Sequence, residues 1–325
     1  MKRTNKLYNN MYKYKNIKLA FDEVCRNTAN KKRVLIMRNN ESNIITKVHD
    51  ILLERKYKPG ECNVFQIDDP KPRKIVSQKM IDKIINHLIA REILYPAVLP
   101  RLLDCNVASR KGLGTAKALK YRRDYDNYYK MRYGKYYILK ADVSKFFQNI
   151  DHEILKEKLR KVIKDKDAID ILEVLIDSNI QESIGARSKY RRNDKPGACH
   201  FYLNDLDHFI KEKLKIKGYV RYQDDFLVYC ESKSKLKKYT KEIENFLHKE
   251  KLKFNPKTRI YNSNNNFVFV GINKYGEYRN YRNVKRRIKK KIYECKIGKI
   301  DIYQFFCSVQ CFESLMRRKL IFKED

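Results

Sequence analysis

The chain has 325 residues, of which 74 are Lys or Arg and 39 are Asp or Glu, so its formal net charge is +35 at pH 7. Hydrophobic residues make up 42% and aromatic residues 12% of the chain, which is enough for a buried core and for two or three subdomains. A compact body with this much positive charge repels itself, so the balance predicts a polyanionic partner, above all nucleic acid, although an AT-rich genome also favours lysine.

Several classes of protein are disfavoured by what the sequence lacks. The eight cysteines are widely spaced and form no Cys-x-x-Cys pair, which argues against a zinc site or a disulfide framework and for reduced thiols in a core. No signal-peptide segment follows the basic N-terminus, and no apolar run approaches the about 20 residues that span a membrane. We therefore expect a cytoplasmic protein without a membrane partner.

The first half of the chain predicts helices around one hairpin. Residues 1–60 are basic, and SNIITKVHDILLERKYKPG has the apolar spacing of a helix that ends at Pro59-Gly60. Residues 63–78, NVFQIDDPKPRKIVSQ, follow a strand–turn–strand pattern with a basic tip. KMIDKIINHLIAREILYPAVLP predicts an amphipathic helix that runs until Pro96, and ASRKGLGTAKALKYRRDYDNYYK predicts a basic loop and a further helix.

The second half mixes strands and helices. YYILKADVSKFF is the clearest strand and has its apolar residues before Asp142; a long helical region, 151–178, and a polar loop, 182–200, come next. FYLNDLDHFIKEKLK predicts a helix, YVRYQDDFLVYC a tight hairpin with QDD at its bend, and KLKKYTKEIENFLHKEKLKF another helix. Short strands at 267–272 and a basic helical end, 283–320, complete the pattern. This order predicts an α+β fold rather than a doubly wound sheet.

Carboxylates stand at the ends of two of these strands. Asp142 ends the clearest strand, and Asp224 and Asp225 lie at the bend of the apolar hairpin. Carboxylates about 4 Å apart repel by about 4 kcal/mol at an effective dielectric constant of 20, and a bound cation relieves that repulsion. Because Mg²⁺ prefers carboxylates and substrate phosphates, the pattern predicts a two-metal site for phosphoryl transfer. Single aspartates at turns, such as Asp151 and Asp207, are instead expected to cap helices or to face solvent.

The same stretches resemble the motifs of reverse transcriptases. KADVSKFFQNIDHEIL resembles the first palm motif, with Asp142 in the metal-binding place, and YQDDFLVY resembles the YxDD box. DDPKPRKI followed by KMIDKIINHLI, and NVASRKGLGTAKAL, resemble the two fingers motifs of bacterial members. KLKFNPKTRIY resembles a later palm motif with a Lys-Thr pair, and FVFVGI resembles the motif just before the thumb. The ordered set covers about residues 62–272.

The resemblance implies a right-hand polymerase of fingers, palm and thumb that extends DNA on an RNA template. Residues 1–60 would form a basic helical extension, 61–275 the fingers and an antiparallel palm sheet that carries the YxDD hairpin, and 276–325 a short helical thumb. The implied partners are a structured RNA template, a DNA or RNA primer and dNTPs. Because the thumb is short, an accessory protein is a further expected partner.

Carried over to this chain, the resemblance also implies the metal site and the sugar gate. Asp142, Asp224 and Asp225 would hold two Mg²⁺ ions, for which Mn²⁺ can substitute, and the backbone carbonyl of Val143 would be a further ligand. The ring of Phe147 falls where the family keeps a bulky side chain against the 2′ position of the sugar, which would exclude ribonucleotides.

Basic residues complete the implied active site. Lys71 and Arg73, at the tip of the fingers hairpin, would bind the triphosphate of the incoming nucleotide. Arg110 and Lys111 would contact phosphates from a basic loop. Lys257 falls near the family's proton donor to pyrophosphate.

One motif departs from the family pattern. The family has a Gly-x-x-x-Ser-Gln or Gly-x-x-x-Ser-Pro box before the helix that here reads FYLNDLDHFIKEKL. Arg191 stands in the Gly place and Lys195 in the Ser place, while Pro196 matches the Ser-Pro variant. In the family this segment lies against the templating base, so Lys195 and Pro196 are expected template contacts, and the basic residues predict phosphate affinity.

The chain resembles the group II intron-like lineage of prokaryotic reverse transcriptases. Within that lineage, its length and its RKGLGT motif are most similar to reverse transcriptases of diversity-generating retroelements or of anti-phage defence systems. Two other functions stay open. One is template-independent or protein-primed DNA synthesis, and the other is a catalytically idle RNA-binding scaffold. A scaffold need not retain the three aspartates and Phe147, so their presence favours an enzyme.

Overall fold

The structure is a computed structural model of the chain, which divides into two compact units, Met1–Ser263 and Asn264–Asp325. For residues 65–67, 73–76, 281–285 and 287 only the backbone is described. The described residues are 3–28, 30–67, 73–108, 110, 112–178, 201–276, 281–302 and 305.

The N-terminal part is helical, as predicted. Its helices are α1 (Tyr14–Asn27), α2 (Lys31–Asn39) and α3 (Glu41–Leu53). Ile17, Phe21 and Val24, at helical spacing on α1, are buried. The prediction that the third helix ends at Pro59-Gly60 is wrong, because Arg55 adopts a left-handed conformation with φ +55° and Lys56 donates its N–H to the Ile51 carbonyl at 3.1 Å. This backward hydrogen bond closes the helix six residues earlier.

The hairpin predicted at 63–78 is confirmed. Strands β1 (Asn63–Ile67) and β2 (Arg73–Ser77) pair antiparallel, with Asn63 opposite Ser77 and Ile67 opposite Arg73.

The helix after this hairpin does not end at Pro96. It begins as α4 (Met80–Leu88), widens into a π-helical turn (Ile89–Leu94) and continues as α5 (Tyr95–Val98). Tyr95 donates its N–H to the carbonyl of Ala90, five residues back. Proline lacks an N–H and its ring clashes with the carbonyl four residues back, so the wider turn lets the helix accommodate Pro96 without breaking.

The helical region predicted at 151–178 is present as two helices, α7 (His152–Val162) and α8 (Lys166–Asp177). Asp151 caps α7 by accepting from the Ile154 N–H at 3.0 Å, which confirms its expected role. Between the helices, Asp165 accepts from the N–H groups of Leu7 and Tyr8 at 2.6 and 2.9 Å. The break therefore docks the N-terminal segment against the helices.

A four-stranded antiparallel sheet in the order β4-β5-β3-β6 confirms the α+β class. Its strands are β3 (Tyr137–Asp142), β4 (Tyr219–Tyr222), β5 (Asp225–Cys230) and β6 (Arg259–Asn262). The strands predicted at 267–272 are wrong: within the described residues that stretch has an isolated bridge between Phe269 and Ile272, and the fourth strand lies earlier in the chain.

The helix predicted at 201–215 is short, with α11 (Asn204–His208) followed by a π-helical turn (Phe209–Lys213).

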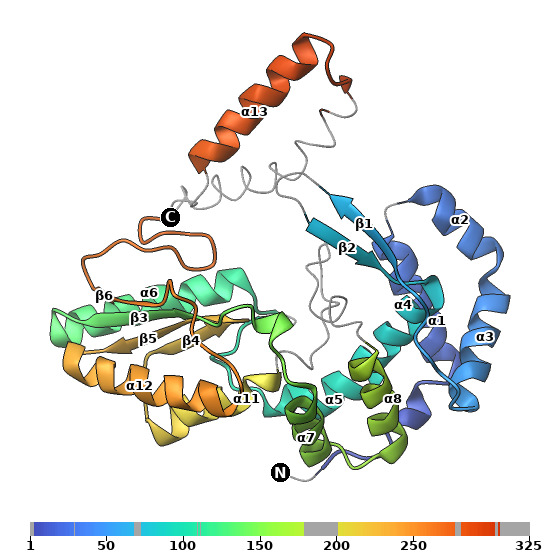
Figure 1. Cartoon of the computed structure of the whole chain (residues 1–325), viewed down its shortest axis with the longest axis horizontal. Helices are drawn as coiled ribbons and strands as arrows, with labels where there is room; N and C mark the ends of the chain where they lie inside the picture. The colour runs from blue at the N-terminus through green and yellow to red at the C-terminus, as the bar shows by residue number, and fades with distance from the viewer. Residues whose placement is uncertain are drawn as a thin grey trace. The chain divides into compact units, whose positions relative to one another are not determined.

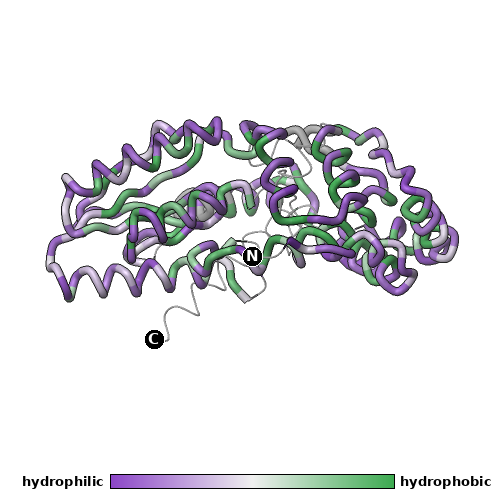
Figure 2. The backbone as a smooth tube through the Cα atoms, turned by 90° about the horizontal axis from the view of Figure 1, so that it is seen from below, coloured by the Kyte–Doolittle hydropathy of each residue, from purple (hydrophilic) through white to green (hydrophobic). Residues whose placement is uncertain are grey.

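Helices cover both faces of this sheet. Helix α6 (Thr115–Tyr133) lies on one side of the strands and α12 (Lys233–Lys249) on the other (Figure 1). Phe226 and Val228 belong to the core shared with α12, whereas Tyr229, on the opposite face, contacts the rings of Tyr125 and Tyr129 on α6. Hydrophilic and hydrophobic stretches alternate along the helices, as expected for helices with one buried face (Figure 2).

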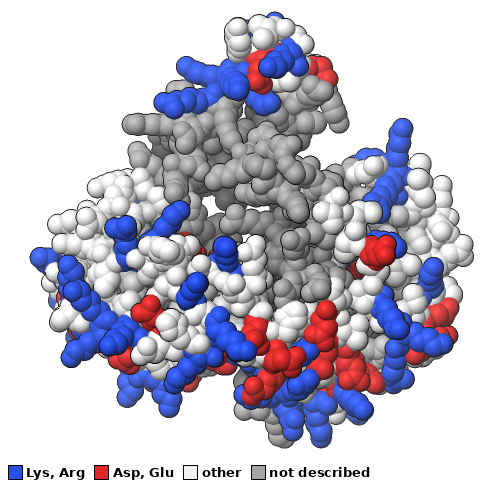
Figure 3. Space-filling model, viewed as in Figure 1, with Lys and Arg blue, Asp and Glu red and all other residues white. Residues whose placement is uncertain are grey.

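Basic side chains are spread over the face shown in Figure 3, whereas acidic side chains gather mainly over α7 and α8. Several of the charges on α7 and α8 are paired: Lys156 with Glu153 at 2.9 Å and with Asp177 at 2.7 Å, and Arg160 with Glu173 at 2.6 Å. The acidic residues there are thus partly neutralised by their own neighbours. Within the second unit, α13 (Tyr281–Lys296) forms the first part of the basic helical end predicted at 283–320, of which residues 306–320 lie outside the described residues. Among the helices of the described residues, none has the length and the apolar character needed to cross a membrane.

Candidate active site

The register of the sheet brings the three predicted aspartates together. Asp142 at the end of β3 lies directly opposite Asp225 at the start of β5, and Asp224 occupies the turn before β5. Val143 donates its N–H to the Asp224 carbonyl at 3.1 Å. This bond marks Asp142 and Asp225 as a non-hydrogen-bonded pair, the arrangement in which Cα atoms are about 4.5 Å apart and side chains are closest.

The turn that carries Asp224 is a tight two-residue connection between β4 and β5. Gln223, at its first position, has φ +61° and is nearly buried. Such turns match the twist of the flanking strands but require a positive φ that costs energy in a residue with a side chain. The Nη1 atom of Arg221 donates to the Gln223 carbonyl at 2.9 Å and so helps to hold this conformation.

Arg221 is itself held by a buried carboxylate. Asp207 on α11 accepts from the Arg221 Nε at 2.7 Å and from the Tyr219 hydroxyl at 2.7 Å, and neither side chain of the Arg221–Asp207 pair is exposed. The expectation that Asp207 caps a helix or faces solvent is therefore wrong. The backbone of Arg221 also donates to the Cys105 carbonyl at 2.8 Å and accepts from the Val107 N–H at 3.1 Å. These contacts fix the β4–β5 hairpin against α11 and the 105–107 segment.

Asn255 is a site residue that the sequence analysis did not single out. Its Nδ2 donates to Asp142 Oδ2 at 2.8 Å, and its backbone N–H donates to the Asp142 carbonyl at 2.7 Å. Thr258 also lies beside the backbone of Asp142, with its hydroxyl 3.4 Å from the Asp142 nitrogen. The Asn-Pro pair at 255–256 is a recognisable turn signal, but its sequence does not tell which carboxylate the turn reaches.

Lys140 is the second residue that the sequence analysis missed. It lies two positions before Asp142 on β3, hence on the same face, and its Nζ is 3.1 Å from Asp225 Oδ1. The two side chains are 21% and 25% exposed. A partly buried ion pair therefore joins neighbouring strands inside the carboxylate cluster.

Burial and mutual repulsion raise the pKa values of two of these carboxyls. Burial raises the pKa of Asp225 to about 6, against the lowering effect of Lys140, and the charges of Asp142 and Asp224 add to the increase. Burial also raises the pKa of Asp142, with a further contribution from Asp224. The hydrogen bond from Asn255 acts in the opposite direction. The cluster thus has negative charge that is costly to keep without a cation.

This raised pKa predicts a pH-dependent difference between the wild-type protein and Asp225→Asn when metal is removed with EDTA. The carboxyl has a pKa of about 6 when folded and an ordinary value of 3.8, so between these values the folded state binds more protons and the contribution of Asp225 to the free energy of unfolding falls as the pH rises. Stability of Asp225→Asn relative to the wild type should therefore increase from about pH 4 to above pH 6. Urea unfolding at several pH values measures it. Effects of carboxyls that do not interact with Asp225 cancel in the comparison, and a pH-independent difference would contradict the assignment.

The donor chemistry of the cluster suits a hard divalent cation, since it combines carboxylates on rigid strand ends. The side chains are not arranged as a finished site: among the described residues, no group of three or more His, Cys, Asp or Glu side chains is placed to hold a metal ion. Asp142 is turned to Asn255 and Asp225 to Lys140. The backbone positions of the three aspartates fit a metal site. To bind an ion, Asp142 would have to turn from Asn255 and Asp225 from Lys140.

The structure also describes two further predicted residues, Phe147 and Lys257. Phe147 is in the short helical turn Phe146–Gln148, half-buried, with its ring centroid 5.1 Å from that of Phe146. Lys257 is exposed, and its charge lowers the pKa of Asp142, which places it close to that carboxylate. The roles of both residues remain predictions.

The other predicted contacts are only partly described. The Nη1 atom of Arg110 donates to the carbonyls of Leu103 and Asn106 at 2.9 and 3.1 Å, so this guanidinium holds its own loop. The backbone of Arg73 begins β2, but its side chain is not described. The remaining candidates lie outside the described residues: Lys71, Lys111, Lys195 and Pro196, together with Arg191 of the altered box.

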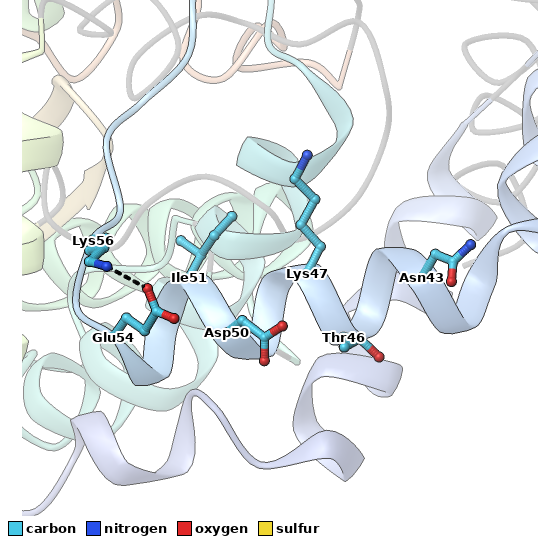
Figure 4. Close-up of a pocket in the computed structure, with 7 residues that line it drawn as sticks. All are labelled: Asn43, Thr46, Lys47, Asp50, Ile51, Glu54 and Lys56. Atoms are coloured by element: carbon cyan, nitrogen blue, oxygen red, sulfur yellow. Dashed lines mark ion pairs between the residues drawn. The ribbon is translucent and has the colours of Figure 1, made fainter.

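Two surface hollows are lined by none of the three clustered aspartates, Asp142, Asp224 and Asp225. One, of about 420 Å³, runs along α3 and the turn after it, where Lys56 pairs with Glu54 at 2.8 Å (Figure 4). The other, of about 590 Å³, lies between α8 and Pro59. Neither is lined by any of the predicted catalytic residues. Substrate binding is therefore not indicated for these hollows.

Comparison with known families agrees with this arrangement. The sheet, its hairpin and the clustered aspartates define a palm-type polymerase fold, and the family model for reverse transcriptase (RNA-dependent DNA polymerase) matches residues 67–274. Since this match covers more than half of the chain, the protein belongs to the reverse transcriptase family and is an RNA-directed DNA polymerase, a nucleotidyltransferase. Members of this family bind a nucleic-acid template and primer and generally use divalent metal ions. No curated protein matches the chain.

Proposed function

We propose that this reverse transcriptase adds dNTPs to a primer 3′-hydroxyl by two-metal nucleotidyl transfer at Asp142, Asp224 and Asp225. The observation that supports it is the pairing of Asp142 opposite Asp225 with Asp224 in the adjoining turn. Three residues with oxygen-donor side chains lie at one end of the sheet, within a strongly basic chain. Structural aspartates alone would have no reason to gather where like charges repel.

In this proposal each residue of the cluster has one task. The three carboxylates, with the carbonyl of Val143, hold two Mg²⁺ ions, and Mn²⁺ can replace them. When bound, these ions lower the pKa of the primer hydroxyl and stabilise the pyrophosphate that leaves. Asn255 keeps the Asp142 carboxylate in place through its side-chain amide.

The basic residues act on the substrate. Lys71 and Arg73 bind the triphosphate, Arg110 and Lys111 contact phosphates, and Lys257 donates a proton to the leaving pyrophosphate. The closeness of Lys257 to Asp142 supports its role. Lys195 and Pro196 contact the template, where the altered box suits a dedicated RNA.

We extend this proposal to the cellular setting and the domains of the protein. The protein works in the cytoplasm of a bacterial cell, in a retroelement or an anti-phage defence system, on a structured RNA. Residues 1–60 form a basic extension, 61–275 the fingers and palm, and 276–325 a short thumb that an accessory protein supplements. The excess of positive charge supports a long nucleic-acid interface.

Primer extension tests the proposed function. Purified protein is incubated with poly(rA)/oligo(dT), dTTP and Mg²⁺, and in parallel without the poly(rA) template. Extension that requires poly(rA) is the expected result. Extension without any template would favour template-independent or protein-primed synthesis, and RNA binding without extension would favour an idle scaffold.

Phe147 is proposed to exclude ribonucleotides. Its ring is half-buried and packs against the ring of Phe146, and Phe147 lies five residues after Asp142 in the chain. Replacing it by Ala removes the clash with a 2′-hydroxyl, and we expect the preference for dTTP over UTP to fall by about 10- to 200-fold, the range for one steric contact in a pocket. Steady-state extension with each nucleotide measures kcat/KM.

Phe146→Leu serves as the matched control for this substitution, because Phe146 is a buried core ring whose loss affects stability rather than nucleotide choice. An unchanged dTTP preference in Phe147→Ala, with extension retained, would show that another residue is the gate.

A further inference from the structure

Lys140 is a cation built into the carboxylate cluster. Its Nζ lies 3.1 Å from Asp225 Oδ1, and both side chains are mostly buried. The residue is on the strand that ends in Asp142, two positions earlier, so the sheet holds its backbone beside the cluster. Its charge also lowers the pKa of Asp142.

The two internal partners of the cluster differ in charge. Asn255 is neutral, so its hydrogen bond to Asp142 orients that carboxylate and leaves its charge unchanged. The Lys140 ammonium group neutralises one of the three negative charges. It also binds the carboxylate of Asp225, which is one of the proposed metal ligands. This arrangement accounts for the lack of a preformed three-carboxylate group among the described residues.

We propose that Lys140 is a positioning residue that competes with divalent metal for Asp225, and so keeps the affinity of the free protein for metal low; this rests on the proposed function of the three aspartates. In the metal-free protein the ammonium group supplies the positive charge beside Asp225. To bind a metal ion, the Asp225 carboxylate must release the Lys140 ammonium group. The Coulomb attraction between Lys140 and Asp225 is then lost, which lowers the affinity of the protein for the metal. A site of this kind takes up metal more readily once an anionic triphosphate offers the ammonium another partner.

Binding of Mn²⁺ to the metal-free protein, followed by electron paramagnetic resonance without nucleotide or nucleic acid, tests this inference. Lys140→Met keeps an unbranched side chain, one heavy atom shorter, and removes its charge. We expect the Kd for Mn²⁺ to fall by about tenfold, which corresponds to about 1.4 kcal/mol. Lys140→Arg keeps the charge and should bind Mn²⁺ within about twofold of the wild type.

Arg259→Met is the matched control. Arg259 lies directly opposite Lys140 on β6 but is exposed to solvent, where its charge is screened. Its loss should change the Kd by less than about twofold. If Lys140→Met bound Mn²⁺ no more tightly than the wild type, or if Arg259→Met gave the same gain, the inference would be overturned.

Asp224→Asn separates this inference from the proposed function. Weaker Mn²⁺ binding in Asp224→Asn, with no gain in Lys140→Met, would refute the role of Lys140 and leave the metal site in place. Mn²⁺ binding that is unaffected by Asp224→Asn would refute the metal site itself.

Discussion

Asp224→Asn is expected to abolish template-directed DNA synthesis while leaving the fold intact. The substitution keeps the shape of the side chain and removes the charge that would hold a divalent ion. Metal ions contribute several kcal/mol of charge stabilisation to such reactions, so we expect kcat to fall by about a thousandfold or more. Extension of oligo(dT) on poly(rA) measures the loss.

The thermal stability of the same variant distinguishes lost chemistry from lost structure. The hydrogen bond from Val143 goes to the backbone carbonyl of Asp224, so the substitution does not remove it. Removing one of several clustered like charges should leave Tm unchanged or higher in metal-free buffer. Asp151→Asn is the matched control, because Asp151 is a helix cap and Asn caps equally well. Activity retained by Asp224→Asn, or lost to the same extent by Asp151→Asn, would refute the assignment.

Asp207→Ala is expected to destabilise the protein more than other single aspartate substitutions. The Arg221–Asp207 pair is completely buried, and Asp207 also accepts from the Tyr219 hydroxyl. Removing one partner of a buried pair leaves a charge without its counter-ion, which costs about 3–5 kcal/mol. We expect Tm to fall by on the order of 10 °C, measured by circular dichroism or calorimetry.

Two further variants test whether the burial of the Arg221–Asp207 pair is the cause of this loss of stability. Asp167→Ala removes an ion pair of similar length, 2.7 Å to Arg55, at a more exposed position, and should cost at most about 1 kcal/mol. Asp207→Leu combined with Arg221→Met removes both buried charges and should recover part of the loss. Equal destabilisation by Asp207→Ala and Asp167→Ala would show that the buried pair does not anchor the hairpin.

The buried pair also connects stability with catalysis. Arg221 binds the Gln223 carbonyl, and Gln223 holds the positive φ of the turn that places Asp224. Variants that loosen Arg221 should therefore lose activity at temperatures where most of the molecules are still folded.

Local features of the sequence predicted much of the candidate site. Alternating apolar residues around QDD predicted a hairpin, and the apolar run before Asp142 predicted a strand that ends there; both are confirmed. Asp151, a single aspartate at a turn, was expected to cap a helix or to face solvent, and it caps α7. Each of these depends on residues that are close in the chain, where turn chemistry and side-chain periodicity act directly.

Long-range contacts could not be predicted in the same way. The helix through Pro96 depends on a π-helical turn, and the buried position of Asp207 depends on Arg221, which lies on a strand rather than on its own helix. Isolated propensities favour a break at proline and solvent exposure for aspartate. The wider π-helical turn accommodates the proline, and Arg221 gives Asp207 a compensating partner in the core.

The sequence by itself therefore determined most of the elements, including the strand and the hairpin that carry the three aspartates of this reverse transcriptase. Only the tertiary structure decided that Asp142 faces Asp225 across two strands, that Asn255 binds Asp142, and that Lys140 occupies Asp225. The physical reason is that strand register and side-chain pairing come from contacts between distant residues, which local patterns do not encode.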